Sequence, residues 1–289
     1  MLTHAPRLFI GREMSSPRNY AVILGVSSGF GKATALALAK QGYHIVGVHL
    51  DRAAGMAAVD ELKTALHELG IDTHFYNVNA ADQDRRTEIV SALSEELAKY
   101  PGASVKVLLH SLAFGSLLPL VGDKDTKVCS QKQLEMTMDV MANSIVYWSQ
   151  SIMAAGLFTR GARIIGLTSA GSSRVLPMYG AVAAAKAAME SYIRQMALEL
   201  AEHGITANSI RAGVTYTPAL DKIPGSDTII KNAYMRNPYH RLTQPEDIAK
   251  VISVLVKPEC DWVNGTILGV DGGEDSIDLT WWTPEDSQS

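Results

Sequence analysis

The sequence predicts an α/β fold in which a doubly wound parallel sheet of about seven strands forms a single domain. Short runs rich in Val, Ile and Leu alternate with helix-like segments, and the runs lack the polar alternation of half-exposed strands. Strands of this kind are buried on both faces, and a helix between successive strands makes a right-handed crossover. No internal repeat or Pro/Gly/Ser-rich linker divides the alternation.

The expected elements follow this alternation along the chain. The predicted strands are 20–26, 44–50, 73–78, 105–110, 163–168, 206–211 and 266–270. The predicted helices are 31–41, 56–69, 85–99, 133–156, 181–202 and 245–256. The segment 217–241 holds three prolines and several large apolar residues, and it is long for a crossover connection, so we expect a substrate lid there.

The flanks of the chain differ from the domain, which we expect to span 19–274. Residues 1–18 form a polar arm that contains Pro6 and Pro17. Residues 275–289 form an acidic tail with Trp281 and Trp282, which we expect to make a surface or subunit contact.

Composition excludes several classes of function. The net charge of -4, from 26 basic and 30 acidic residues, gives no basic footprint for nucleic acid. No apolar run reaches the roughly 18 residues of a membrane span, and two cysteines make no disulfide framework. We expect a cytoplasmic protein. HExxH, clustered Cys/His ligands and GxSxG are absent, so we expect no catalytic metal and no hydrolase.

A glycine-rich turn follows the first predicted strand and opens a helix, with the spacing G-x3-G-x-G. Glycines permit a tight turn and let backbone N–H groups approach a diphosphate at a helix N-terminus. We therefore expect a dinucleotide site here, made by Gly25, Ser27, Ser28, Gly29, Phe30 and Gly31.

The end of the second strand should lie near the adenine ribose. Asp51 there would accept hydrogen bonds from the ribose hydroxyls and repel a 2′-phosphate, whereas Arg52 would do the reverse. Since the glycine turn holds Ser27 and Ser28 and no basic residue, the balance favours NAD(H) slightly, with NADP(H) left open.

At Ser169, Tyr179 and Lys186 the sequence resembles the short-chain dehydrogenase/reductase family. Three further features in the same order carry the resemblance: the glycine turn, Asn77-Val78 after the third strand, and Val-Asp-Gly-Gly at 270–273. The resemblance covers 20–273 and implies a Rossmann-like sheet, an NAD(P)-dependent oxidoreductase and a homotetramer paired through helices 133–156 and 181–202.

Within that family the tyrosine usually lies four residues before the lysine, where this chain has Val182. Tyr179 gives Y-x6-K instead, which resembles the bacterial enoyl-acyl-carrier-protein reductase branch. The segment 110–115, His-Ser-Leu-Ala-Phe-Gly, and Arg211-Ala212-Gly213 are similar to that branch as well. Three features resemble the mainstream members: the spacing of the glycine turn, Ser169, and Asn143 at the helix asparagine.

The resemblance implies a set of site residues. Those implied in catalysis are Tyr179, Lys186, Ser169 and Asn143. Besides the glycine turn and Asp51 and Arg52, those implied in cofactor binding are Asn77, Val78, Ser111, Leu112, Ala113, Lys186, Gly213, Thr215 and Thr217. His110 we expect to be structural, because no carboxylate partner for it is evident.

The displaced tyrosine bears on the substrate. An unperturbed tyrosine, with a pKa of about 10, is a poor acid at neutral pH, and a nearby ammonium group such as Lys186 lowers that pKa. In ketone reduction the carbon that takes hydride carries the oxygen that takes the proton, whereas in an enoyl thioester that oxygen lies three bonds further along. Seven helical residues advance about 10.5 Å against about 6 Å for four, although these distances do not apply if Tyr179 precedes the helix.

We therefore expect an NAD(P)H-dependent enoyl-thioester reductase of fatty acid biosynthesis that acts on a small-molecule or carrier-bound acyl substrate. A ketone or alcohol oxidoreductase is the alternative, favoured by Ser169 and Asn143. A nucleotide sensor without activity is disfavoured because Tyr179 and Lys186 are both present. An acidic carrier would need a basic portal, for which the candidates are Lys222, Lys231, Arg236 and Arg241.

Overall fold

The computed structural model describes residues 17–217, 220–223 and 225–277. Its seven strands form one parallel sheet in the order β3-β2-β1-β4-β5-β6-β7, which confirms the predicted doubly wound fold. The strands are β1 Asn19–Leu24, β2 Tyr43–His49, β3 Thr73–Asn77, β4 Ser104–His110, β5 Phe158–Ser169, β6 Thr206–Ala212 and β7 Ile267–Val270.

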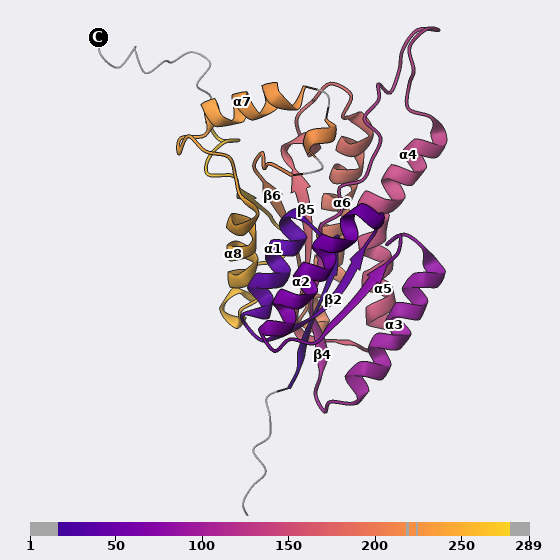
Figure 1. The fold of residues 1–289 in the computed structure, drawn as a ribbon, viewed down its shortest axis with the longest axis vertical. Helices are drawn as coiled ribbons and strands as arrows, with labels where there is room; N and C mark the ends of the chain where they lie inside the picture. The colour runs from indigo at the N-terminus through magenta and orange to yellow at the C-terminus, as the bar shows by residue number, and fades with distance from the viewer. Residues whose placement is uncertain (1–16, 218–219, 224, 278–289) are drawn as a thin grey trace, which may run out of the picture.

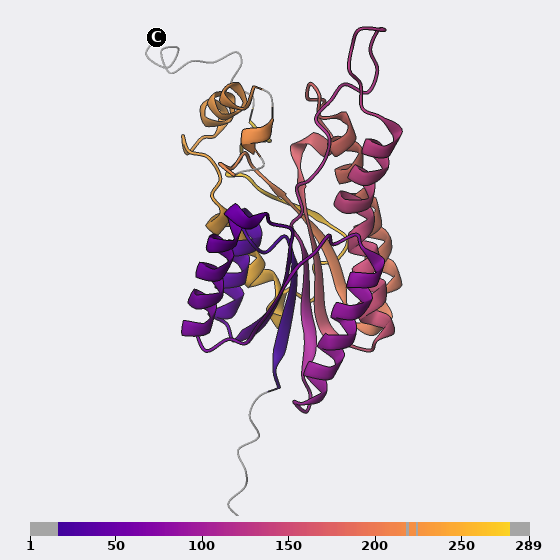
Figure 2. The same cartoon turned by 45° about the vertical axis from the view of Figure 1, so that its right-hand side comes forward.

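Helices cover both faces of the sheet (Figures 1 and 2). The α-helices are α1 Gly29–Ala39, α2 Met56–Glu68, α3 Gln83–Ala98, α4 Gln131–Met138, α5 Ser144–Ala154, α6 Gly180–Glu199, α7 Ser226–Arg236 and α8 Pro245–Leu255. Helices α1, α2 and α8 pack on one face, while α3, α5 and α6 pack on the other. Each face has its own apolar core, so the central strands are buried on both sides, as their continuous apolar runs predict.

The order in which strands are added to the sheet reverses between β1 and β4, although all the strands stay parallel. From β1 it proceeds outward through β2 to β3, and then returns to β4 on the other side of β1. The last residue of β1, Leu24, is in register with His110 at the end of β4. The loops that follow these two strands therefore meet at the carboxyl edge, where doubly wound sheets bind their ligands.

The predicted helix 133–156 is interrupted in the structure. Five residues, Asp139–Asn143, form a π-helical segment between α4 and α5. The Ser144 side chain makes two contacts at this wide turn. Its Oγ donates to the carbonyl of Val140 at 2.8 Å, and His110 Nε2 lies 2.9 Å from the same Oγ. Composition gives no sign of such a bulge, because all the residues involved fit an ordinary helix.

The loop from residue 111 to residue 130, between β4 and α4, projects far beyond the sheet (Figure 1). Asp123 closes its tip by accepting from the Thr126 hydroxyl at 2.6 Å, and the Cys129 N–H donates to the Pro119 carbonyl at 2.8 Å. Leu120 anchors the base of the loop on α6, because a Cβ at Gly180 would lie only 2.7 Å from Leu120 Cδ1.

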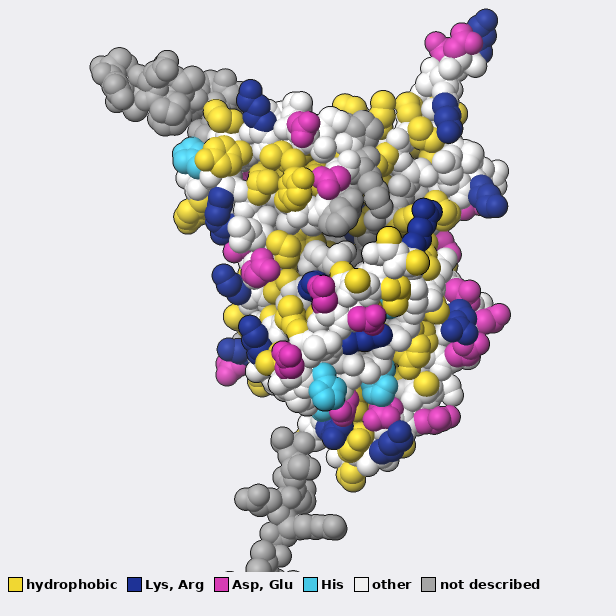
Figure 3. Space-filling view, in the orientation of Figure 1, with side chains coloured by type: hydrophobic (Ala, Val, Ile, Leu, Met, Phe, Trp, Pro, Cys, Tyr) yellow, Lys and Arg dark blue, Asp and Glu magenta, His cyan; other side chains and the backbone are white. Residues whose placement is uncertain are grey.

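The expected lid, 217–241, contains the helix α7, which the sequence did not predict. Apolar side chains gather on the surface near α7 in Figure 3, and the exposed ones in and beside the lid are Tyr216, Tyr234, Met235 and Tyr239. Among the described helices, none combines the length and the hydropathy that crossing a membrane requires. The N-terminal arm, except for Pro17 and Arg18, and the two tail tryptophans fall outside the described residues.

Candidate active site

A pocket of about 380 Å³ opens at the carboxyl edge of the sheet. Its walls come from the glycine turn, the loop after β4, the loop between β5 and α6, the segment from Ala212 into the expected lid, and the turn after β7. Most of the surface is apolar. The polar side chains that line it are Ser111, Thr168, Ser169, Tyr179, Lys186, Thr215, Thr217, Glu274 and Asp275.

The glycine turn has the geometry that a diphosphate cradle requires. Gly25 has φ of +88°, and a Cβ there would lie 2.3 Å from the Ser111 carbonyl oxygen. A Cβ at Gly31 would lie 2.0 Å from the Gly25 carbonyl oxygen. Neither position can therefore carry a side chain unless the backbone moves, and α1 begins within the turn, at Gly29. Phe30 lines the pocket, and Ser27 and Ser28 lie in the same turn.

At the end of β2 the two residues with opposite preferences for a 2′-phosphate have different surroundings. Asp51 Oδ2 lies 2.9 Å from Nδ1 of the buried His49, while Arg52 is exposed and forms no ion pair within the described part of the chain. Asn77 fixes the backbone of Asp51 by accepting from its N–H at 3.0 Å and donating to its carbonyl at 2.9 Å. Val78 is buried beyond β3.

Lys186 is a buried ammonium group at the floor of the pocket. Its Nζ donates to the carbonyl of Leu167 at 2.6 Å and to that of Leu112 at 3.3 Å. Burial lowers the pKa of Lys186 to about 8, although Glu190, one turn further along α6, acts to raise it. An ammonium group has three donors, so one remains for a ligand in the pocket.

Tyr179 lies immediately before α6, as its N-cap residue. The preceding residue, Met178, has φ of +62°, a left-handed conformation that strains a non-glycine residue by about 1–3 kcal/mol. The Tyr179 ring packs on Gly171, where a Cβ would lie 2.5 Å from the ring carbon Cε1. The turn and this close contact together hold the phenol against the pocket.

Ser169 ends β5 beside the phenol. Burial raises the pKa of Tyr179, and the Ser169 hydroxyl opposes this rise. The lowering of this pKa by Lys186 that the sequence led us to expect is therefore wrong, because burial has the larger effect. The two groups do not meet at regular hydrogen-bond geometry, and Ser169 Oγ is buried without a partner among the residues that the structure describes. A buried hydroxyl without a partner is costly, and a ligand oxygen in the pocket would satisfy it.

Asn143 is not brought to the pocket with the other three. It ends the π-helical segment, and its Oδ1 accepts from the Tyr192 hydroxyl at 3.1 Å. The pocket residue of this segment is Met141, two positions earlier. His110 is fully buried beneath the site, and burial, with the Lys186 charge nearby, lowers its pKa to about 3. A neutral, hydrogen-bonded imidazole fits the structural role expected for His110.

Comparison with known proteins identifies the family. The family model described as "Enoyl-(Acyl carrier protein) reductase" matches residues 25–274. The chain belongs to the short-chain dehydrogenase/reductase family. It is therefore an oxidoreductase that uses a nicotinamide cofactor.

Relatives within this family carry different activities. A cyclohexanol dehydrogenase of Acinetobacter sp. (strain SE19) is 28% identical and covers 87% of this chain and 93% of its own length. A 3-oxoacyl-(acyl-carrier-protein) reductase of Thermotoga maritima is 26% identical, over 87% of this chain and 96% of its own. A solved structure of an enoyl-(acyl-carrier-protein) reductase (NADH) from Aquifex aeolicus shares the fold, with a TM-score of 0.76 and 20% identity over 91% of this chain and 98% of that one.

The described residues fit the nicotinamide cofactor of a short-chain dehydrogenase/reductase. The glycine turn brings its backbone close to Ser111 and to itself, and Phe30 of the turn lines the pocket together with the Ser111–Ala113 segment, Gly213, Thr215 and Thr217. Thr217 links the lid to the turn, because a Cβ at Gly29 would lie 3.5 Å from Thr217 Cγ2. Asp51, Asn77 and Val78, which we expect near the adenine ribose, lie after β2 and at the end of β3, outside the pocket itself.

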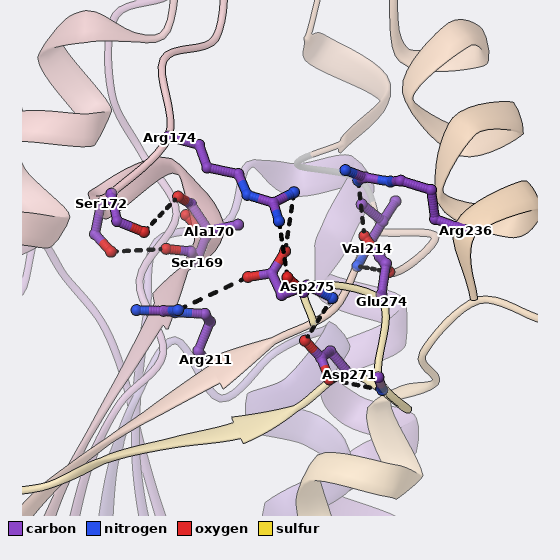
Figure 4. Close-up of polar contacts among 12 residues, drawn as sticks. Ser169, Ala170, Ser172, Arg174, Arg211, Val214, Arg236, Asp271, Glu274 and Asp275 are labelled. Atoms are coloured by element: carbon purple, nitrogen blue, oxygen red, sulfur yellow. Dashed lines mark hydrogen bonds and ion pairs between the residues drawn. The ribbon is translucent and has the colours of Figure 1, made fainter. Parts of the chain in front are cut away.

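Two acidic residues of the pocket were not expected. Glu274 and Asp275 follow the Val-Asp-Gly-Gly segment, at the boundary of what the sequence presents as a tail. Figure 4 shows their partners: Asp275 lies between Arg174 and Arg211, and Glu274 faces Arg236 and the backbone of Val214. Burial raises the pKa of Glu274, and the Val214 N–H and Arg236 oppose that rise. The clue in the sequence is the strand-end position of these residues, next to the carboxyl edge of β7.

Proposed function

We propose that this oxidoreductase reduces the 2,3 double bond of an enoyl thioester. The observation that carries the proposal is the position of the phenol: Tyr179 precedes α6, while the pocket-lining residue four before Lys186 is Val182, which has no hydroxyl. The proton donor therefore enters the pocket from a displaced position. This suits a substrate whose oxygen lies three bonds beyond the carbon that takes hydride.

The chain's own residues would handle orientation and proton transfer. When bound, the reduced nicotinamide supplies the hydride that adds to the β-carbon. Negative charge then develops on the thioester oxygen, and the Tyr179 hydroxyl donates a hydrogen bond to that oxygen. Transfer of the Tyr179 proton yields the enol of the saturated thioester. The enol would then tautomerise to the thioester: a solvent proton adds to the α-carbon, and the enol O–H returns its proton to the Tyr179 phenolate. Lys186 would stabilise the phenolate that remains, and its free donor would hold the ribose hydroxyls.

The apolar walls suit an acyl chain. Leu112, Phe114 and Leu117 come from the loop after β4, and Leu220, Ile223 and Ile229 come from the lid. Burying an aliphatic chain against such a surface contributes about 25 cal/mol for each Å² removed from water. The pocket would thus bind the hydrocarbon part of the substrate and exclude water from the reacting atoms.

The test is cofactor oxidation by the purified protein with crotonyl and acetoacetyl thioesters, each supplied with NADH and with NADPH. We expect faster turnover of the crotonyl thioester. Faster reduction of the 3-ketoacyl thioester would contradict the proposal. No turnover of either, with cofactor binding intact, would favour a nucleotide sensor.

A ketone or alcohol oxidoreductase is the second candidate. The buried, unpartnered hydroxyl of Ser169 beside Tyr179 favours it, because that hydroxyl can bind a carbonyl oxygen. Asn143 gives it less support, since its side chain bonds Tyr192 and does not line the pocket. Acetoacetyl thioester and cyclohexanone separate the two candidates in the same assay.

The carrier of the acyl group is a further part of the proposal. Of the four basic residues expected at a portal, Arg236 pairs with Glu274 and Arg241 pairs with Asp247, while Lys231 is exposed. The side chain of Lys222 lies outside the described part of the chain. We propose a carrier-protein substrate, and a lower KM for crotonyl carrier protein than for crotonyl-CoA, lost in Lys231→Glu, would support it.

A further inference from the structure

The C-terminal segment beyond β7 reaches into the pocket. Its turn is held by Asp271, whose carboxylate accepts from the N–H of Gly273 at 2.9 Å and from that of Asp275 at 3.1 Å. The lid also contacts this turn, because Asn237 Nδ2 donates to the Asp271 carbonyl at 2.9 Å. From this turn Asp275 points toward Arg174 and Arg211, and Glu274 points toward Arg236, as Figure 4 shows.

Asp275 contacts the loop that carries Tyr179. Arg174 in this loop donates to the Asp275 carbonyl at 2.9 Å, and its guanidinium lies 3.3 Å from the Asp275 carboxylate. The same carboxylate lies 3.8 Å from Arg211 at the end of β6. Within the described residues, the other hydrogen bonds of this loop are local, such as Ser172 Oγ to the Ser169 carbonyl at 3.0 Å. Arg174 is thus the side chain that ties the loop to the C-terminal segment.

Glu274 contacts the lid helix. Its side chain is 4% exposed, and Oε1 lies 3.6 Å from the guanidinium of Arg236, the last residue of α7. Oε2 accepts from the Val214 N–H at 3.1 Å. The adjacent carboxylates therefore hold two different walls of one pocket: the loop with the phenol, and the lid.

We propose that Glu274 and Asp275 form a clasp, in which Asp275 is a positioning residue for Tyr179, acting through Arg174, and Glu274 is a positioning residue for the lid, acting through Arg236. The role of Tyr179 in this statement rests on the proposed function. The contacts themselves do not, and they can be tested without a substrate.

The first measurement is amide hydrogen exchange of the full chain without substrate. In Asp275→Asn and Arg174→Gln we expect faster exchange at 170–179 and unchanged exchange at 226–236. In Glu274→Gln and Arg236→Gln we expect faster exchange at 226–236 and unchanged exchange at 170–179. Glu88→Gln, which breaks an exposed ion pair with Arg85 on α3, is the matched control and should change neither segment. If Asp275→Asn does not fold, Arg174→Gln carries the test, because its side chain is 38% exposed.

The second measurement is the split between kcat and KM, with whichever substrate the chain reduces. We expect Asp275→Asn and Arg174→Gln to lower kcat about tenfold or more, non-additively in the double variant. Asp275→Glu should recover part of that loss, and Glu274→Gln should chiefly raise KM. Unchanged exchange at both segments overturns the clasp, as does a fall in kcat that is equal for both carboxylate variants and additive with Arg174→Gln. If no thioester is reduced, the proposed function fails while the exchange result still decides the clasp.

Discussion

At the scale of single residues, burial sets the proton affinity of the site. Lys186 loses its hydration and has a pKa of about 8, against 10.5 for an ordinary lysine. Tyr179 is buried as well, and its pKa is raised, which keeps the phenol protonated. In the proposed mechanism, the form with both protons would donate to the substrate oxygen, and the ammonium group of Lys186 would then stabilise the phenolate.

We predict that kcat/KM falls as the pH rises through about 8, because Lys186 then loses its positive charge. Arginine stays protonated, so the kcat/KM of Lys186→Arg should not fall in this pH range (the alkaline limb of the profile), even if its activity is lower. The measurement is kcat/KM from about pH 6 to 10. A flat profile in the unaltered protein would contradict the assignment.

Glu190 provides an independent check of that limb. It accepts from the Thr168 hydroxyl at 2.6 Å and raises the pKa of Lys186. We predict that Glu190→Gln moves the limb to lower pH, because removing a nearby negative charge disfavours the ammonium form. A limb that stays in place, in a variant that melts at the normal temperature, would show that Lys186 does not produce it.

We predict that Tyr179→Phe lowers kcat/KM by about 10²–10⁴, the range for loss of a general acid. NADH and NADPH should bind as before, because the phenol is no part of the expected cofactor cradle. Activity within about twofold of the unaltered protein would exclude Tyr179 as the proton donor.

At the scale of elements, the turn between β1 and α1 requires glycine at Gly25, because the backbone there leaves no room for a Cβ atom. We predict that Gly25→Ala abolishes measurable cofactor binding, because its Cβ would overlap the Ser111 carbonyl. Gly42→Ala is the matched control: its φ of +85° imposes the same backbone strain, but no atom lies within 4 Å of the added Cβ. Calorimetric titration with NADH checks both, and equal binding losses would show that strain alone is responsible.

The strands were predictable because a strand that is buried on both faces needs a continuous run of apolar residues. Most helices were predictable as the segments between these runs. Helix α7 was not, because Pro218, Pro224 and Pro238 lie around it and obscure its pattern. The π-helical bulge at Asp139–Asn143 depends on contacts with β4, so local sequence contains no sign of it. That bulge also bears on Asn143, whose side chain bonds Tyr192 instead of lining the pocket.

At the scale of the whole molecule, a cofactor that binds where the loops after β1 and β4 meet should also raise the free energy of unfolding. Cofactor at about 100 times its Kd should stabilise the fold by about 2.7 kcal/mol, which is roughly 4–5 °C in Tm for a chain of this size. We predict that Asp51→Asn, which retains a partner for His49, shifts this protection toward NADPH about tenfold in relative affinity, and Arg52→Ala shifts it toward NADH.

Thermal melts with each cofactor measure this preference, with Asp60→Asn on α2 as an exposed acidic control. If neither Asp51→Asn nor Arg52→Ala changes the ratio of NADH to NADPH affinity, the adenine ribose does not lie at the end of β2.

Much of the candidate site was predictable because the glycine turn, Ser169, Tyr179 and Lys186 resemble the motifs of a known family. In the structure Ser169, Tyr179 and Lys186 line one pocket at the carboxyl edge of the sheet, where parallel strands bring their ends together. Glu274 and Asp275 also follow a strand, but their partners could not be recognised from the sequence, since only the folded chain brings Arg174 to Asp275 across 101 residues.

The turn after β7, which carries Glu274 and Asp275, lies late in the chain, and this has a consequence for protein synthesis. A ribosome has already made all seven strands before it adds Glu274 and Asp275. The sheet therefore owes none of its strands to residues 274 and 275, whereas the loop of Tyr179 and the helix α7 take carboxylate partners from them. A premature stop codon after residue 273 would leave all seven strands in the product and remove both carboxylates from the pocket.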